Sequence, residues 1–168
     1  KRFHYLATHM VEKAIAKDAL IVSENGAGTA ILFKTNAKEE NFWKDLPKEL
    51  ALVRHVTGIK NALKILKKQK YIKAQRPLEG DYLYCWFWGI LPDTRGFGDE
   101  TQTAKEMKDK MMDVADKLQL PLYAETRKRK VVIVYRRYGF DMFHEWVQPD
   151  GEKMWFLRYI PVKGVPHK

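Results

Sequence analysis

An apolar and aromatic segment from Tyr82 to Leu91 is the feature of this chain that most constrains its fold. Its interior carries no polar residue apart from tyrosines and Cys85. A run of this kind is typical of a strand that is covered on both faces, and we expect it at the centre of a sheet. Pro92 ends the strand, and the loop Asp93 to Gly98 leads from it into a helix.

This helix is expected to begin at Asp99, whose carboxylate can accept backbone hydrogen bonds while Gln102 reaches back, as in a capping box. Apolar residues at three- and four-residue spacings carry the helix to about Leu118. The short strand Leu122 to Glu125 follows. A strand, a helix and a strand in this order predict a parallel crossover.

The remaining segments complete a mixed α/β domain. Thr126 is the expected N-cap of a helix that runs to Tyr138, although the β-branched run Val131 to Val134 favours a strand by propensity. Elsewhere the periodicity predicts a helix over Phe3 to Lys17, a hairpin of Ala19 to Val22 with Thr29 to Phe33, helices within Lys38 to Lys73, and closing strands Phe140 to Val147 and Met154 to Ile160.

Length and composition predict a single domain over residues 1–168. With 168 residues, 45% of them apolar, the chain can bury one sizeable core but not two. No apolar run approaches the roughly 20 residues that span a bilayer, and Lys1 to Met10 lacks the apolar stretch of a secretory signal, so we expect a cytoplasmic protein with no membrane partner. The single cysteine excludes an internal disulfide, and the histidines lack metal-ligand spacing, so no metal is predicted.

The net charge of +10 raises the question of an anionic partner. Nucleic acid, acidic lipid and a phosphate-rich cofactor all satisfy that sign. The basic residues concentrate at Lys60 to Lys73 and at Arg127 to Lys130, and a solvated basic surface is the alternative explanation for both clusters.

The junction from Gly89 to Gly98 is the segment that points most directly to an anion. A strand ends there and a helix N-terminus follows, so exposed backbone N–H groups and the helix dipole converge on the loop. Glycine residues allow a backbone to approach a diphosphate closely because they have no Cβ.

Four segments, taken in chain order, resemble the GNAT acetyltransferases. Residues 89–98, Gly-Ile-Leu-Pro-Asp-Thr-Arg-Gly-Phe-Gly, resemble the strand and acetyl-CoA loop of that family. Leu120 to Glu125, Tyr135 to Phe140 and Met154 to Arg158 resemble, in order and spacing, its fifth strand, its tyrosine-bearing helix and its last strand. The resemblance implies a mixed, mostly antiparallel sheet flanked by helices, with a splayed parallel strand pair at the cofactor site, and a chain that lacks the family's usual first strand and helix.

The resemblance also implies an acetyl-CoA site and one catalytic residue. Tyr135 matches the tyrosine that donates a proton to the departing thiolate. The backbone of Ile90 and Leu91 is expected to pair with the pantetheine arm. The diphosphate is expected to lie against Arg95, Gly96, Phe97, Gly98, Asp99 and Glu100, or in a second register against Asp99 to Ala104.

Acetyl transfer to a small amine or related acceptor, by direct attack in a ternary complex, is the function that this resemblance implies. A GNAT-fold domain that has lost catalysis and binds coenzyme A or a partner is the alternative, and a basic nucleic-acid-binding module ranks last. A monomer and a homodimer both stay open.

The acceptor side of the site is less specified by the sequence. Glu79, Asp81, Glu125 and His144 are candidate proton acceptors that the sequence does not separate. Tyr84, Trp86 and Trp88 are candidates for the wall of the acceptor pocket.

Overall fold

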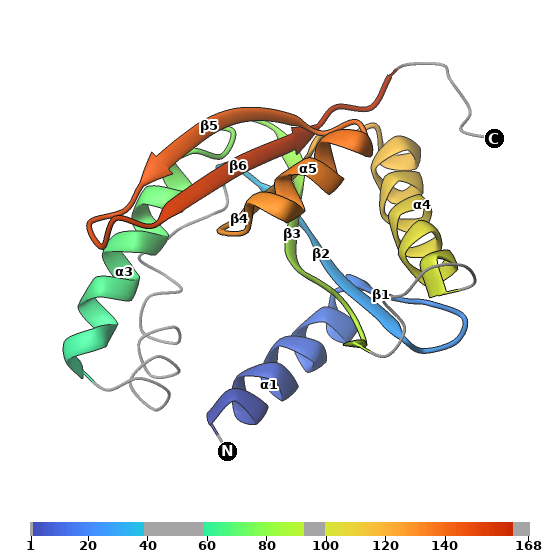
Figure 1. The fold of residues 1–168 in the computed structure, drawn as a ribbon, viewed down its shortest axis with the longest axis horizontal. Coiled ribbons are helices and arrows are strands. Elements are labelled where there is room, and N and C mark those ends of the chain that lie inside the picture. The colour runs from blue at the N-terminus through green and yellow to red at the C-terminus, as the bar shows by residue number, and fades with distance from the viewer. Residues whose placement is uncertain (1, 39–58, 93–99, 163–168) are drawn as a thin grey trace.

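A computed structural model describes residues 2–38, 59–92 and 100–162 of the chain (Figure 1). The described helices and strands are, in chain order, α1 (Arg2–Ala16), β1 (Leu20–Val22), β2 (Gly28–Asn36), α3 (Ile59–Ala74), β3 (Asp81–Ile90), α4 (Glu100–Leu118), β4 (Leu122–Thr126), α5 (Arg129–Arg137), β5 (Asp141–Val147) and β6 (Lys153–Tyr159). None of the described helices is both long enough and apolar enough to cross a bilayer.

The strands form one six-stranded sheet in the order β1-β2-β3-β4-β6-β5. β3 and β4 are parallel, and every other neighbouring pair is antiparallel. Helix α4 makes the crossover between the two parallel strands, as the order of elements predicts. The mostly antiparallel sheet with one parallel pair confirms the fold class expected from the sequence.

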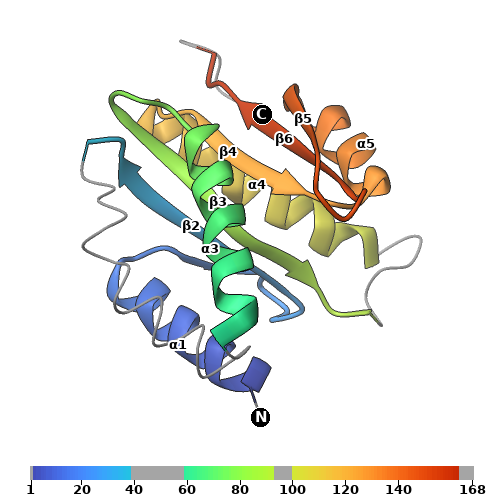
Figure 2. The same cartoon turned by 90° about the vertical axis from the view of Figure 1, so that its left-hand side faces the viewer.

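Helices cover both faces of this sheet (Figures 1 and 2). The alternation along β2 separates the two sides, because neighbouring residues of a strand point to opposite faces. Ile31 and Phe33 pack against α1, whereas Ala30 and Leu32 belong to the core that α4 and α5 cover. Ile72 of α3 packs against β6 on the same face as α1. We call these the α1/α3 face and the α4/α5 face.

A β-bulge at Trp86 interrupts the alternation of β3. Cys85 pairs with Leu32 and Phe87 pairs with Ile31, so Trp86 has no partner of its own in β2. The extra residue shifts every later side chain of β3 to the other face of the sheet. Trp86 and Phe87 are 36% and 44% exposed, so the prediction that this strand is covered on both faces is wrong at the bulge.

Helix α5 begins later than the sequence predicts. Its N-cap is Lys128, which makes no side-chain capping hydrogen bond. Thr126 instead ends β4 opposite Trp155, and its Oγ1 accepts a hydrogen bond from the Lys128 amide at 3.2 Å. The β-branched run is helical nevertheless, because Val132 and Tyr135 bury one side of the helix against the core.

Candidate functional site

The parallel strands β3 and β4 part shortly after they meet (Figure 2). Their register contains two pairs, Leu83 with Leu122 and Tyr84 with Tyr123. Beyond these pairs β4 continues alongside β6 while β3 continues alongside β2. The sheet therefore opens on the C-terminal side of Tyr84, and this divergence is where chemical groups from both faces can meet.

Tyr135 of α5 lies at the start of the divergence, on the α4/α5 face. Its side chain lies next to the thiol of Cys85, the residue that follows the last paired position of β3, and that thiol donates a hydrogen bond to the Phe87 carbonyl at 3.7 Å. Its ring packs edge-on against Trp88 and Phe140, with ring centroids 5.3 Å and 4.7 Å away. These three contacts fix the ring of a side chain that is buried.

Both polar groups of this contact keep their protons near neutral pH. Burial raises the pKa of Tyr135 well above its ordinary value, and the neighbouring Cys85 adds to the effect. Burial also raises the pKa of the Cys85 thiol to about 12. The pair therefore presents a phenol that can donate a proton and a thiol that carries no charge.

Glu125 of β4 lies at the same divergence, with its side chain on the α1/α3 face. The hydroxyl of Tyr84 donates a short hydrogen bond to Glu125 Oε1. The guanidinium carbon of Arg76, just after α3, lies 3.6 Å from the centre of the Tyr84 ring. Burial raises the pKa of Glu125, and the hydrogen bond from Tyr84 and the charges of Arg76 and Lys68 oppose this increase only in part.

Helix α4 is held firmly against the β1–β2 hairpin near its N-terminal end. Asn25 Nδ2 donates a hydrogen bond to the buried Thr103 Oγ1 at 2.8 Å, and Glu106 Oε1 accepts one from the Glu24 amide at 2.8 Å. Gly28 allows the close approach, because a Cβ at this position would lie 2.6 Å from Met107 Cγ. These contacts fix the first turns of α4 against the hairpin.

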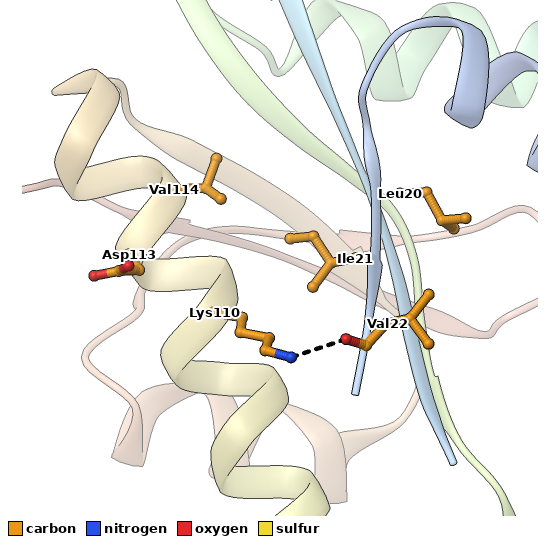
Figure 3. Close-up of a pocket in the computed structure, with 6 residues that line it drawn as sticks. All are labelled: Leu20, Ile21, Val22, Lys110, Asp113 and Val114. Carbon is orange, nitrogen blue, oxygen red and sulfur yellow. Dashed lines mark hydrogen bonds between the residues drawn. The ribbon is translucent and has the colours of Figure 1, made fainter. Parts of the chain in front are cut away.

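A shallow groove between β1 and α4, with a volume of about 340 Å³, lies elsewhere (Figure 3). Its lining comprises Leu20, Ile21, Val22, Lys110, Asp113 and Val114. Lys110 Nζ reaches across it to donate a hydrogen bond to the Val22 carbonyl at 3.0 Å. The ammonium group thus caps the edge strand. We place the functional site at the divergence, around which lie Tyr84, Cys85, Glu125 and Tyr135, all with raised pKa values.

Comparison with known proteins identifies this architecture. No family model and no curated protein matches the sequence. Among solved structures, arylalkylamine N-acetyltransferase 2 from Aedes aegypti is similar at a TM-score of 0.64 and 14% identity, over 94% of this chain and 80% of that one. The chain has the GNAT fold.

Two other solved structures agree. The histone acetyltransferase HPA2 and related acetyltransferase from Corynebacterium glutamicum matches at a TM-score of 0.61 and 14% identity, over 99% of this chain and 77% of that one. An agmatine N-acetyltransferase matches at a TM-score of 0.52 and 11% identity, over 80% and 69% of the two chains. At these identities the likeness establishes the fold and leaves the function to the site.

The GNAT-type site residues predicted from the sequence lie partly within the described residues. Tyr135 lies on α5 next to the start of the divergence. Ile90, the last residue of β3, lies on the part of that strand that no longer pairs with β4. The amide of Leu91 donates a hydrogen bond to the Ala27 carbonyl at 2.9 Å, so it faces β2. Glu100 begins α4. Arg95, Gly96, Phe97, Gly98 and Asp99 lie outside the described residues.

The structure separates the candidate proton acceptors. Asp81 is bound by Asn36 and Lys34, and the hydrogen bond from Asn36 lowers its pKa most. Glu79 is exposed, and His144 contacts the Tyr71 hydroxyl at 3.0 Å on the outer part of the sheet. Glu125 alone of the four lies at the divergence. No group of His, Cys, Asp and Glu among the described residues could hold a metal ion.

The three candidate acceptor-pocket aromatics do not share a face. Tyr84 points to the α1/α3 face, where it bonds with Glu125, whereas Trp88 packs with Tyr135 and Tyr138 on the α4/α5 face. The bulge at Trp86 is the cause, since it reverses the alternation between the two positions. Only the register of β2 against β3 reveals this.

Proposed function

We propose that this protein is an acetyl-CoA-dependent N-acetyltransferase that acts on a small amine or related acceptor by direct transfer in a ternary complex. The observation that carries the proposal is the divergence of β3 from β4, with the protonated Tyr135 hydroxyl at its start. Structures of the same fold include enzymes named for arylalkylamines and for agmatine, both of which are amines.

The residues at the divergence fit the cofactor. Past Tyr84 the side of β3 that faces β4 is paired with no strand among the described residues, and an extended pantetheine arm with its own amides can run along such an edge. On the α4/α5 face, the buried indole Nε1 of Trp88 has no hydrogen-bond partner among the described residues, and a pantetheine carbonyl would supply one.

We propose residues that bind the pantetheine arm and the diphosphate of the cofactor. Ile90 would hold the pantetheine arm, whereas the amide of Leu91 is bonded to Ala27 and faces β2. Arg95, Gly96, Phe97, Gly98, Asp99 and Glu100 would hold the diphosphate. Helix α4, which begins at Glu100, is fixed in place by the hairpin contacts, so its first N–H groups and its dipole favour an anion there.

Acetyl-CoA would supply a thioester whose carbonyl carbon an amine can attack. Tyr135 would then give its proton to the departing sulfur, a role that its raised pKa favours by keeping it protonated. Cys85 is the only thiol of the chain, and a pKa of about 12 leaves very little thiolate near neutral pH. An acyl-cysteine intermediate is therefore disfavoured, which supports direct transfer.

A two-part experiment tests the proposal. Calorimetric titration with acetyl-CoA is expected to give one site per chain, and an acceptor screen that detects released thiol is expected to find turnover of at least one amine. Binding without turnover of any acceptor would support the alternative of a GNAT-fold domain that has lost catalysis. Absence of binding at near-millimolar acetyl-CoA would contradict the proposal altogether.

A further inference from the structure

We propose that the carboxylate of Glu125, held by the Tyr84 hydroxyl, accepts the proton that the cationic acceptor amine must lose before it attacks. This assignment rests on the proposed acetyl transfer, and it adds the catalytic group that the sequence leaves open. It follows from where Glu125 lies, what holds it, and which face of the sheet it occupies.

Glu125 lies two residues beyond Tyr123, the last residue of β4 that pairs with β3. It therefore projects where the two strands have begun to part. Its charge helps to raise the pKa values of Cys85 and Tyr135, whose side chains lie on the opposite face of the sheet. The divergence is the place where a reacting carbonyl could be reached from both faces.

The carboxylate is held in one orientation. Tyr84 donates to Oε1, which leaves Oε2 to accept another proton. The Tyr84 ring is in turn covered by the Arg76 guanidinium group, 3.6 Å from the ring centre. Opposite Glu125 in the register stands Phe156, which packs with Ile72 of α3. An apolar wall on one side and a fixed hydrogen bond on the other are what a positioned base requires.

Acid and base then occupy opposite faces of the sheet. Tyr135 approaches the divergence from the α4/α5 face, and Glu125 approaches it from the α1/α3 face. An acceptor amine must therefore come from the α1/α3 face, while the sulfur lies toward Tyr135. This separation keeps the proton donor and the proton acceptor from neutralising each other.

The charged and titratable groups that interact with Glu125 come from several elements. On its own face they are Tyr84 of β3, Lys68 of α3 and Arg76 after α3, and from the opposite face Cys85 of β3 and Tyr135 of α5 interact with it. Arg127, Asp150 and Glu152 act in turn on Lys68. Burial raises the pKa of Glu125 by more than the hydrogen bond from Tyr84 and the charges of Arg76 and Lys68 lower it. The net increase makes this carboxylate a stronger base than an exposed glutamate.

The proton balance closes with these two residues. The acceptor R–NH₃⁺ gives one proton to Glu125 and becomes R–NH₂, whose lone pair forms the new C–N bond. As the C–S bond breaks, the electron pair stays on sulfur, which takes the Tyr135 proton. The second nitrogen proton returns to the Tyr135 oxygen, directly or through water. Glu125 then releases its proton to solvent, so that amide, free thiol and one H⁺ leave.

The test compares Glu125→Gln with wild type on phenethylamine, agmatine, spermidine and a lysine-containing peptide. Glutamine keeps the acceptor oxygen for Tyr84 and removes only the basic group. We expect kcat to fall by about 100-fold or more while the Kd for acetyl-CoA stays within about threefold. Asp81→Asn and Glu79→Gln, which alter the other candidate carboxylates, serve as matched controls and are expected to keep wild-type rates.

The dependence of the rate on pH distinguishes a catalytic Glu125 from a purely structural one, because loss of a structural contact would not change the shape of the profile. The rate of Glu125→Gln is expected to rise about tenfold per pH unit up to the pKa of the amine, because only the neutral fraction of the acceptor can react. Wild type should instead level off once Glu125 is ionised. A Glu125→Asp variant, which retains the carboxylate, should recover the wild-type shape at a lower kcat.

The outcomes separate the two claims. If wild type turns over and Glu125→Gln is equally fast, or has the same pH profile as wild type, this assignment is overturned. The acetyltransferase proposal would then still stand. Wild type that acetylates none of the four probes would overturn both. If Glu125→Gln does not fold, a Glu125→Asp profile without an acidic limb would overturn the assignment.

Discussion

The buried side chain of Tyr135 on α5 lies next to the thiol of Cys85 on β3, one residue beyond the last position at which β3 pairs with β4. This contact fixes a protonated phenol at the point where the sheet opens. Because burial keeps both groups uncharged, the pair can offer a proton to a sulfur anion without first losing one to solvent.

Tyr135→Phe is expected to lower kcat by about 100-fold or more, because the departing thiolate loses its proton donor. The Kd for acetyl-CoA should change less than about threefold, since the aromatic contacts with Trp88 and Phe140 survive. The rate of thiol release measures kcat, and calorimetry measures the Kd for acetyl-CoA. Tyr138→Phe, at the C-cap of the same helix, is the matched control and should behave as wild type; equal losses in both variants would contradict the role of Tyr135.

Cys85→Ala is expected to keep kcat within about fivefold, because the acetyl group does not pass through the thiol. Burial and a pKa of about 12 also predict that iodoacetamide labels Cys85 only after unfolding. Intact-protein mass spectrometry checks both points. An acetylated protein that forms with acetyl-CoA and disappears in Cys85→Ala would refute direct transfer.

Glu125→Gln is expected to raise the melting temperature at pH 8. In the unfolded chain a glutamate titrates at about 4.3, and burial raises its pKa in the folded protein. The folded state thus binds this proton more tightly, so the carboxyl begins to cost stability as pH rises above about 4.3 and costs most above the folded pKa.

The gain from Glu125→Gln should therefore shrink toward zero as the pH falls to about 4. Glu145→Gln is the control with the opposite sign, because the hydrogen bond from Lys153 lowers the pKa of Glu145. Thermal melts from pH 4 to pH 8 test the pair of variants. A Glu125→Gln variant that is less stable than wild type at pH 8 would contradict the burial of an ionised carboxylate.

Trp86→Ala is expected to affect the acceptor amine, and Trp88→Phe is expected to affect acetyl-CoA. Trp86 is 36% exposed beside the α1/α3 face, so its loss should raise the KM of an apolar amine and spare acetyl-CoA. Trp88→Phe removes the buried Nε1 on the other face, which should weaken acetyl-CoA about 2- to 10-fold, as loss of one hydrogen bond does. Steady-state kinetics with each substrate varied in turn measure both effects. If Trp86→Ala weakened acetyl-CoA and Trp88→Phe raised the KM of the amine, the assignment of the two faces would be contradicted.

Local patterns in the sequence predict most of this fold. The three- and four-residue spacing of apolar side chains predicts α1 and α4, and the strand-helix-strand order around α4 predicts that β3 and β4 are parallel. The β-branched run of α5 forms a helix because Val132 and Tyr135 pack on the core, a tertiary effect that overrides propensity.

The site depends on pairings that no local pattern contains. The bulge at Trp86 exists only in the register of β3 against β2, and it decides that Tyr84 and Trp88 face opposite sides. In the sequence, Glu125 is one of several carboxylates near the ends of predicted strands. The β3–β4 register places it beside Tyr84, 41 residues away in sequence. Burial, and with it the raised pKa, follows from that pairing.

Hydrogen exchange of the wild-type protein with and without acetyl-CoA is the most direct test of the central claim, that the opening between β3 and β4 is the cofactor site. At about 100 times Kd, the ligand should add about 2.7 kcal/mol of stability and slow exchange most at the amides of β3 beyond Tyr84, with Trp88 among them. Unchanged exchange along β3 at near-millimolar acetyl-CoA, or protection confined to the groove between β1 and α4, would contradict it.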